Sequence, residues 1–147
     1  MIYFVSDIHL GAGGSSVARR TERAFCRWLD TIAEDATALY LLGDIFDFWF
    51  EYHRVVPRGF TRVLARLAEL SARGVRVVLF TGNHDMWCYD YLEEECGVEI
   101  VRNPRVVELD GVKVHLAHGD NLNISGQPML KLMNTIFRSS VARTLFS

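Results

Sequence analysis

Four short polar clusters in this sequence combine carboxylate, imidazole and amide side chains. In chain order they are Ser6-Asp7-Ile8-His9, Gly43-Asp44, Gly82-Asn83-His84-Asp85 and His118-Gly119-Asp120. Oxygen and nitrogen donors without cysteine suit Mn²⁺, Fe, Co²⁺ or Zn²⁺ better than a thiolate zinc site or an all-oxygen calcium site. The clusters therefore indicate a transition-metal centre if the fold brings them together.

The number of donors favours two metal ions rather than one. Two ions ~3.5 to 4 Å apart share a carboxylate, and together they activate water for attack on phosphorus. Asp44 is the predicted bridge between them. Taken singly, Asp7, Asp44 and Asn83 could equally be helix caps or turn residues. Four such clusters in order, each after an apolar run, favour the metal interpretation.

The apolar runs before the clusters predict the elements that position them. Strands are expected over residues 2–5, 38–42 and 75–80, and apolar residues at helical spacing predict helices over 24–32 and 63–70. This alternation predicts a mostly parallel sheet with helices on its faces. Loops beyond the carboxyl ends of parallel strands converge on one crevice, so the clusters should meet there.

The pattern changes in the last third of the sequence. After a predicted short helix over 89–95, strands 106–109 and 112–117 are expected to form a hairpin. Asp110-Gly111 between them suits a two-residue turn. The second strand leads into His118, whereas His115 alternates with Lys113 along it and is expected at or near the surface.

Composition limits the classes of function. The 16 basic and 18 acidic side chains give a net charge of -2, which provides no general attraction for nucleic acid. The three cysteines, Cys26, Cys88 and Cys96, form no close pair and are interpreted as reduced thiols of a cytoplasmic protein. No apolar run approaches the ~18 residues of a membrane span. The oligomeric state is left open.

The blocks SDIHLG, GDIFDFW, GNHD and HGD resemble, in order, the signatures of the calcineurin-like metallophosphoesterase superfamily. The resemblance implies an α/β fold, namely the N-terminal portion of a layered α-β-β-α sandwich with a mostly parallel first sheet and a hairpin of the second. It also implies a hydrolase with two divalent ions, Mn²⁺ first. By resemblance, the first metal is bound by Asp7 and His9, the bridge is Asp44, and the second metal is bound by Asn83 and His118.

The same resemblance assigns further roles near the metals. His84 is expected to steady the charged transition state or to protonate the leaving group, with Asp85 orienting it. Asp47 is expected to orient a metal-binding histidine. Some members of the superfamily have arginine at the position of His84.

The wider context GDIFDFWFEY, GNHDMW and HGDNL is most similar to the UDP-2,3-diacylglucosamine diphosphatases of lipid A synthesis. This implies a nucleotide-linked lipid substrate, cleaved to UMP and 2,3-diacylglucosamine 1-phosphate, and transient contact with the inner leaflet of the inner membrane. Phe48, Trp49 and Trp87 are candidates for contact with the acyl chains. Ordinary core packing explains these aromatic residues equally well.

Members of the superfamily normally carry a later G-H-x-H block, whereas all 5 histidines here lie at or before position 118. We therefore interpret residues 1–147 as a single domain that is incomplete at its C-terminus. Open metal positions should lower metal occupancy and activity. Residues 121–147 predict a basic amphipathic helix, which suits a lid or an anionic membrane surface.

Two other functions are compatible with the sequence. One is a phosphodiesterase acting on small nucleotides or phosphoproteins. The other is a non-catalytic scaffold of the same fold, which stays open because the later histidines are absent. His84 argues against the scaffold, because a binding surface needs no transition-state histidine.

Overall fold

The structure, a computed structural model, describes residues 1–52 and 55–119. Asp120 of the fourth cluster and the helix expected over 121–147 therefore lie outside the described residues.

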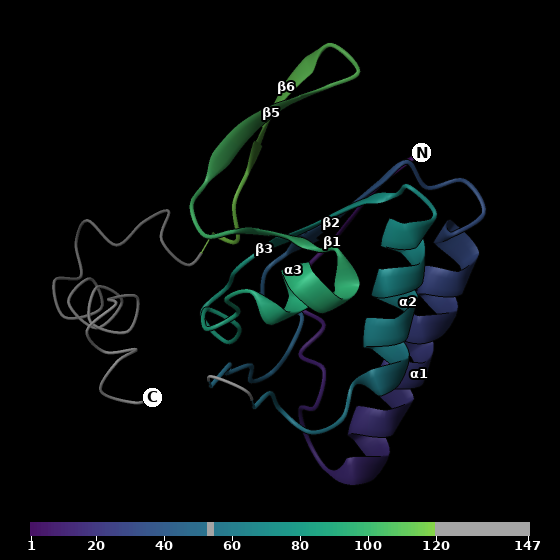
Figure 1. The fold of residues 1–147 in the computed structure, drawn as a ribbon, viewed down its shortest axis with the longest axis vertical. Coiled ribbons are helices and arrows are strands. Elements are labelled where there is room, and N and C mark those ends of the chain that lie inside the picture. Colours follow the sequence, from purple (N-terminus) through teal and green to yellow (C-terminus); the bar gives the residue numbers. More distant parts are fainter. Residues whose placement is uncertain (53–54, 120–147) are drawn as a thin grey trace, which may run out of the picture.

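Helices and strands alternate as the sequence predicts. The elements are β1 (Ile2–Val5), α1 (Ser15–Ile32), β2 (Ala38–Leu42), α2 (Thr61–Ala72), β3 (Arg76–Phe80), α3 (Tyr91–Cys96), β4 (Glu99–Val101), β5 (Arg105–Leu109) and β6 (Val112–Leu116). The first four strands form one parallel sheet in the order β1-β2-β3-β4, and β5 pairs with β6 in a separate antiparallel sheet (Figure 1). The predicted α/β architecture is confirmed.

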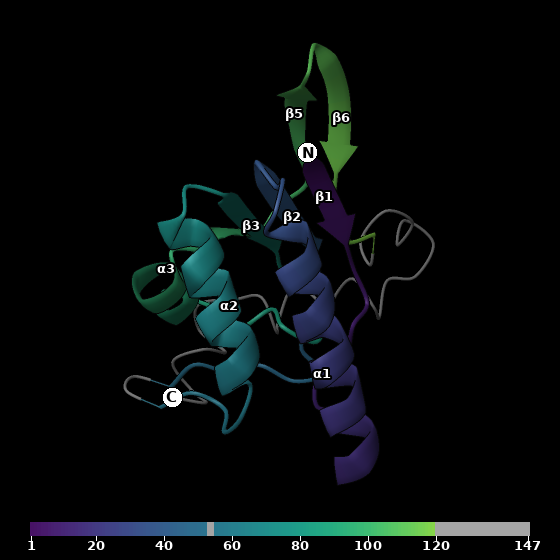
Figure 2. The same cartoon turned by 90° about the vertical axis from the view of Figure 1, so that its right-hand side faces the viewer.

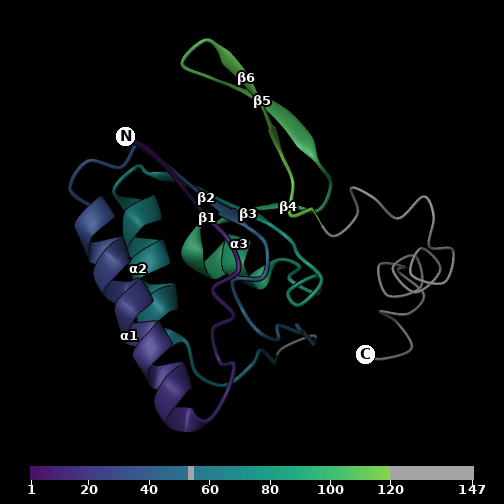
Figure 3. The same ribbon diagram turned by 180° about the vertical axis from the view of Figure 1, so that it is seen from behind.

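The two faces of the parallel sheet contribute to two different clusters of buried side chains. Because side chains alternate along a strand, Leu39 and Leu41 of β2 pack with the helices, whereas Tyr40 packs with Leu116 of the hairpin. Helices α1 and α2 lie side by side against the first face (Figure 2). The hairpin extends on the other side of the sheet, away from the helices (Figure 3).

Two details of the hairpin agree with the sequence. Asp110 and Gly111 both have positive φ, 50° and 80°, and they join the paired residues Leu109 and Val112. This is the backbone that a two-residue type I′ turn requires, so the predicted turn is confirmed. His115 is exposed, also as predicted.

The sequence patterns missed β4 and the start of α1. Glu99–Val101 is too short for periodicity to distinguish a strand from a loop, and only its pairing with β3 defines it. The helix α1 begins at Ser15. Its buried residues all lie in its second half, so the helical spacing of apolar residues does not mark its first turns.

Cys26, Cys88 and Cys96 are buried and form no disulfide, in agreement with their predicted reduced state. Within the described ranges, none of the helices has the length and apolar character needed to cross a membrane.

Glu99 joins three strands through ion pairs, and we predict a pH-dependent contribution to stability. Its carboxylate lies 2.7 Å from an Arg76 nitrogen and 2.8 Å from an Arg105 nitrogen. The hydrogen bond from Arg76 and then the charges of both guanidinium groups lower the pKa of Glu99 below its ordinary value of 4.5. This stabilisation is therefore complete above pH 4.5 and is lost as the pH falls through the lowered pKa.

Glu99→Gln should accordingly lower the free energy of unfolding by about 1 kcal/mol at pH 7, because these ion pairs are partly exposed. The difference from the wild type should shrink at pH 3. Urea unfolding at both pH values measures it, with Glu34→Gln as the control at an exposed position after α1. A difference that is constant with pH would contradict the ion-pair explanation.

Candidate metal centre

The loops after β1 and β2 continue side by side beyond the sheet. The amide of Asp7 donates to the Gly43 carbonyl at 3.1 Å, and the amide of His9 donates to the Asp44 carbonyl at 3.0 Å. These hydrogen bonds extend the pairing of the two strands, so the first and second polar clusters lie side by side beyond the end of the sheet. The convergence expected at the carboxyl ends of parallel strands is thus observed for this pair.

The third and fourth clusters reach the same place through side chains. The amide of His84 donates to Asp44 Oδ1 at 3.0 Å, which joins the loop after β3 to the loop after β2. His118, at the end of the hairpin, places Nδ1 2.8 Å from the Leu42 carbonyl oxygen. All four clusters therefore meet at one end of the parallel sheet.

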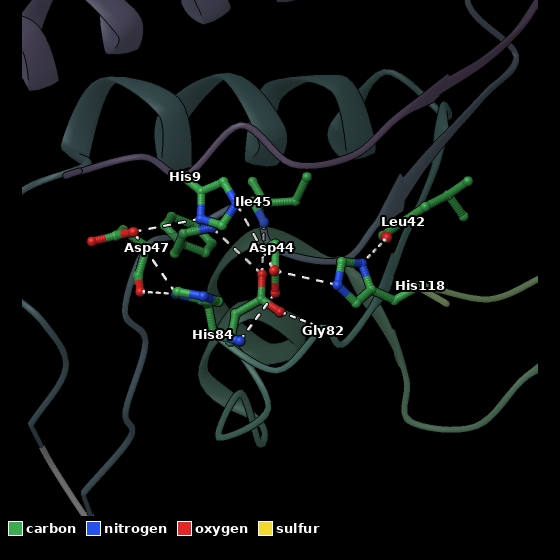
Figure 4. Close-up of polar contacts among 10 residues, drawn as sticks. His9, Leu42, Asp44, Ile45, Asp47, Gly82, His84 and His118 are labelled. Atoms are coloured by element: carbon green, nitrogen blue, oxygen red, sulfur yellow. Dashed lines mark hydrogen bonds and ion pairs between the residues drawn. The ribbon is translucent and has the colours of Figure 1, made fainter. Parts of the chain in front are cut away.

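Asp44 is the centre of the arrangement (Figure 4). It belongs to two groups of three donors, Asp7 with Asp44 and His118, and His9 with Asp44 and His84, and the donor atoms within each group lie within 4.8 Å of one another. Its Oδ2 lies 3.3 Å from His118 Nε2 and 3.9 Å from His9 Nε2. A carboxylate common to two donor groups is the arrangement that a two-metal site needs, so the residues fit a pair of divalent cations.

Four of the expected ligands are divided between the two groups. The Asp7 carboxylate lies with His118 beside Asp44, and the assignment of Asp7 and His9 to one metal stays a prediction. His9 lies with His84, and their rings meet edge to face at 4.8 Å. Asn83 is exposed in the same loop as His84. Its role as a ligand remains a prediction.

The backbone at three of the expected ligands is strained. Asp7, His9 and Asp44 have φ values of 56°, 48° and 54°, in the left-handed region that residues other than glycine rarely adopt. Each such residue costs about 1–3 kcal/mol, and such strain is concentrated at functional sites. Its presence at these three residues supports their assignment to the centre.

Two glycines of the clusters are needed for close approach. A Cβ on Gly43, whose φ is 87°, would overlap the His118 ring. A Cβ on Gly82 would overlap the carboxylate and the amide nitrogen of Asp44. The sequence alone suggested only that such glycines shape turns, because the overlapping residues are distant along the chain.

Asp47 lies between two histidines and contacts both. Its Oδ1 is 3.4 Å from His9 Nδ1, and its role in orienting a metal-binding histidine stays a prediction. Its backbone carbonyl oxygen is 2.7 Å from His84 Nδ1. That hydrogen bond is the main cause that raises the pKa of His84, followed by the charges of nearby carboxylates and opposed by burial. The imidazolium form of His84 is thereby favoured.

Asp85 makes different contacts from the one expected. Its carboxylate is buried and accepts hydrogen bonds from the amides of Ile45, Phe46 and Gly82, while the His84 ring is held by Asp47 instead. Burial raises the pKa of Asp85, and the three amide donors oppose that rise. The hydrogen bonds from Ile45 and Phe46 direct the Asp85 carboxylate toward the loop after β2 and not toward the His84 ring.

The three aromatic candidates for substrate contact have different environments. Trp49 is 0% exposed and packs against Phe46 in the core, so its expected contact with substrate is corrected. Phe48 is 57% exposed, and Trp87 is half-buried with its ring edge-on to Phe48 at 6.4 Å. Of these three candidates, Phe48 and Trp87 therefore keep solvent-accessible surface.

Glu51 is a structural residue that sequence reasoning missed. It is buried and accepts hydrogen bonds from the Trp49 indole and from the amides of Tyr89 and Asp90. These bonds fasten the loop after β2 to the start of α3. A carboxylate among the aromatic residues of the segment FWFEY was the available signal.

The fold and this site together define an α/β protein with a candidate two-metal centre at the carboxyl ends of a parallel sheet. A family model described as calcineurin-like phosphoesterase matches residues 1–141. The chain belongs to the calcineurin-like phosphoesterase family.

Curated relatives make the similarity more specific. A UDP-2,3-diacylglucosamine hydrolase from Porphyromonas gingivalis is 45% identical over 99% of this chain and 56% of its own length. Another protein of that name, from Ralstonia nicotianae, is 36% identical over 82% of this chain and 44% of its own length. The chain thus spans about half the length of these relatives.

A solved structure shares the fold at low sequence identity. It is a protein of unknown function from Aquifex aeolicus, 21% identical, with a TM-score of 0.53 over 93% of this chain and 72% of that one. This similarity concerns the fold alone.

Proposed function

We propose that this chain carries the metal centre of a hydrolase that cleaves the pyrophosphate of UDP-2,3-diacylglucosamine to UMP and 2,3-diacylglucosamine 1-phosphate. The observation that carries the proposal is the position of Asp44, whose carboxylate lies between the proposed ligands His118 and His9, at 3.3 Å and 3.9 Å. The relative from Porphyromonas gingivalis, named as a hydrolase of this compound, supports the choice of substrate.

The ligands proposed for two divalent cations are Asp7, His9, Asp44, Asn83 and His118. Mn²⁺ is the first choice, and Fe, Co²⁺ and Zn²⁺ also suit such donors. Bound cations would supply an activated water and neutralise charge on phosphate oxygens. The protein prepares the site: the Leu42 carbonyl faces His118 Nδ1, which leaves Nε2 directed toward Asp44.

His84 is proposed to act on the substrate directly. Its Nδ1 is engaged by the Asp47 carbonyl, so Nε2 is the nitrogen left to meet a phosphate oxygen. The raised pKa of His84 favours an imidazolium that can donate a hydrogen bond or a proton where negative charge develops. Asp47 thereby fixes the direction of the ring and engages its Nδ1.

Exposed apolar side chains near the centre are proposed to meet the acyl chains and the membrane. Phe48, Tyr52 and Val55 are 57%, 41% and 63% exposed and lie close together along the chain after β2. They offer apolar surface to a doubly acylated sugar at a bilayer. Cytoplasmic location with transient contact at the inner membrane follows from this proposal.

Release of UMP from UDP-2,3-diacylglucosamine in the presence of Mn²⁺ tests the proposal. We expect hydrolysis of this substrate and much slower hydrolysis of UDP-glucosamine without acyl chains. Preference for unacylated nucleotide diesters would support the phosphodiesterase alternative. Mn²⁺ binding with no hydrolysis of any phosphate ester would support the scaffold.

Phe48→Ala should raise KM for the acylated substrate about 10-fold, since burial of a phenylalanine side chain against an acyl chain contributes about 1.5 kcal/mol or more. The midpoint of thermal unfolding should change little, because the side chain is mostly exposed. Steady-state kinetics and thermal melts measure both. The control is Val106→Ala, 60% exposed on the hairpin. An equal effect in the control would contradict the assignment.

A further inference from the structure

The side chain of Asp85 spans two loops of the metal centre. It is 0% exposed, and both carboxylate oxygens are used. Oδ2 accepts hydrogen bonds from the amides of Ile45 at 2.8 Å and Phe46 at 3.4 Å. Oδ1 accepts one from the amide of Gly82 at 2.7 Å.

These contacts lie just beyond the paired part of the sheet. The last pair in the register of β2 and β3 is Leu42 with Phe80, and farther along the chain the Trp49 amide donates to the His84 carbonyl at 3.2 Å. Asp85 reaches the residue directly after Asp44 and the residue directly before Asn83. The amide of His84 returns to Asp44 Oδ1 at 3.0 Å, so the two loops are tied in both directions.

A buried carboxylate does not stabilise a fold by its burial. Burial of a charge is costly unless hydrogen bonds compensate for lost hydration, and here three amides share that task. An asparagine amide could accept on one side only, because its NH₂ group would face a second donor. The carboxylate is thus the group that can hold both loops at once.

We propose that Asp85 is a positioning residue that sets the separation of the loop bearing Asp44 from the loop bearing Asn83, and thereby the metal affinity of the centre. The proposal rests on the metal centre of the proposed function but not on its substrate. Loss of a contact that orients ligands in this way typically weakens metal binding about 10- to 100-fold.

Isothermal titration of the 147-residue chain with Mn²⁺ alone tests this proposal. Asp85→Asn should bind Mn²⁺ at least about 10-fold more weakly than the wild type. Glu51→Gln is the matched control, because Glu51 is also a buried carboxylate that accepts backbone amides, but at the start of α3. It should lose thermal stability while its Mn²⁺ affinity stays within about 2-fold, since its carboxylate accepts from the Trp49 indole and the start of α3 and not from the residues next to Asp44 and Asn83.

Equal affinity in Asp85→Asn and the wild type, or an equal loss in both variants, would overturn the positioning role. Hydrogen exchange on the metal-free wild type gives a second test that needs no variant. The amides of Ile45, Phe46 and Gly82 should exchange slowly, and rapid exchange at all three would also overturn it. Absence of Mn²⁺ binding by the wild type would contradict the proposed centre itself and this inference with it.

Discussion

Asp44→Asn is expected to weaken the binding of Mn²⁺ about 100-fold or more and to abolish hydrolysis. The change removes the negative charge that both groups of donors share, so both metal positions are affected together. Asparagine keeps an oxygen that can accept the His84 amide, so the metal-free fold should persist. Isothermal titration with Mn²⁺ and thermal melts without metal measure the two effects separately.

Asp30→Asn is the control for the loss of one carboxylate. Asp30 pairs with Arg66 between α1 and α2 and is not a member of either donor group. Its substitution should leave Mn²⁺ affinity unchanged. Unchanged affinity in Asp44→Asn as well would exclude Asp44 from the metal centre.

Gly82→Ala is expected to lower the free energy of unfolding by about 3 kcal/mol and to prevent metal binding. The added Cβ would overlap the Asp44 carboxylate and, more seriously, a backbone nitrogen that cannot move without disturbing the loop after β2. Overpacking at well-packed positions typically costs about 1–3 kcal/mol, and backbone overlap belongs at the upper end. Urea unfolding followed by circular dichroism measures the change.

Gly14→Ala separates overlap from the general effect of replacing a glycine. A Cβ at Gly14 meets nothing within 4 Å, and its φ of -68° suits any residue. Gly14 is the N-cap of α1, where alanine is less favourable than glycine, so the change should lower the free energy of unfolding by about 1 kcal/mol at most, well below the effect at Gly82. Gly82→Ala with wild-type stability and intact Mn²⁺ binding would show that the close approach to Asp44 has no importance.

The strands and the meeting of the clusters could be predicted because they depend on pattern. The runs that became β1, β2 and β3 are apolar except for Arg76 at the start of β3, as expected for strands of a sheet that is covered on both faces. Their parallel order then brings Asp7, Asp44 and His84 to one end of the sheet. Neither the strands nor the meeting of the clusters depends on the direction of any one side chain.

The directions of side chains within the loops could not be predicted, because loop sequences have no hydrophobic periodicity. Trp49 and Phe48 are neighbours in one aromatic run, yet one is fully buried and the other is 57% exposed. In the same way, Asp47 and Asp85 both flank the site, and only the structure shows that Asp47 holds the His84 ring. The direction of a loop side chain depends on contacts distant in sequence.

The hydrogen bond between His118 and Leu42 joins residues 76 positions apart, and this separation bears on the order of folding. Closure of a long loop costs more conformational entropy than closure of the βα units of the first sheet, so distant contacts form later. His118 therefore takes its place only when the hairpin docks. The described donors therefore come together only in the folded chain, and we expect metal binding to follow folding. Bound cation then stabilises the finished state by mass action, most strongly against undocking of the hairpin.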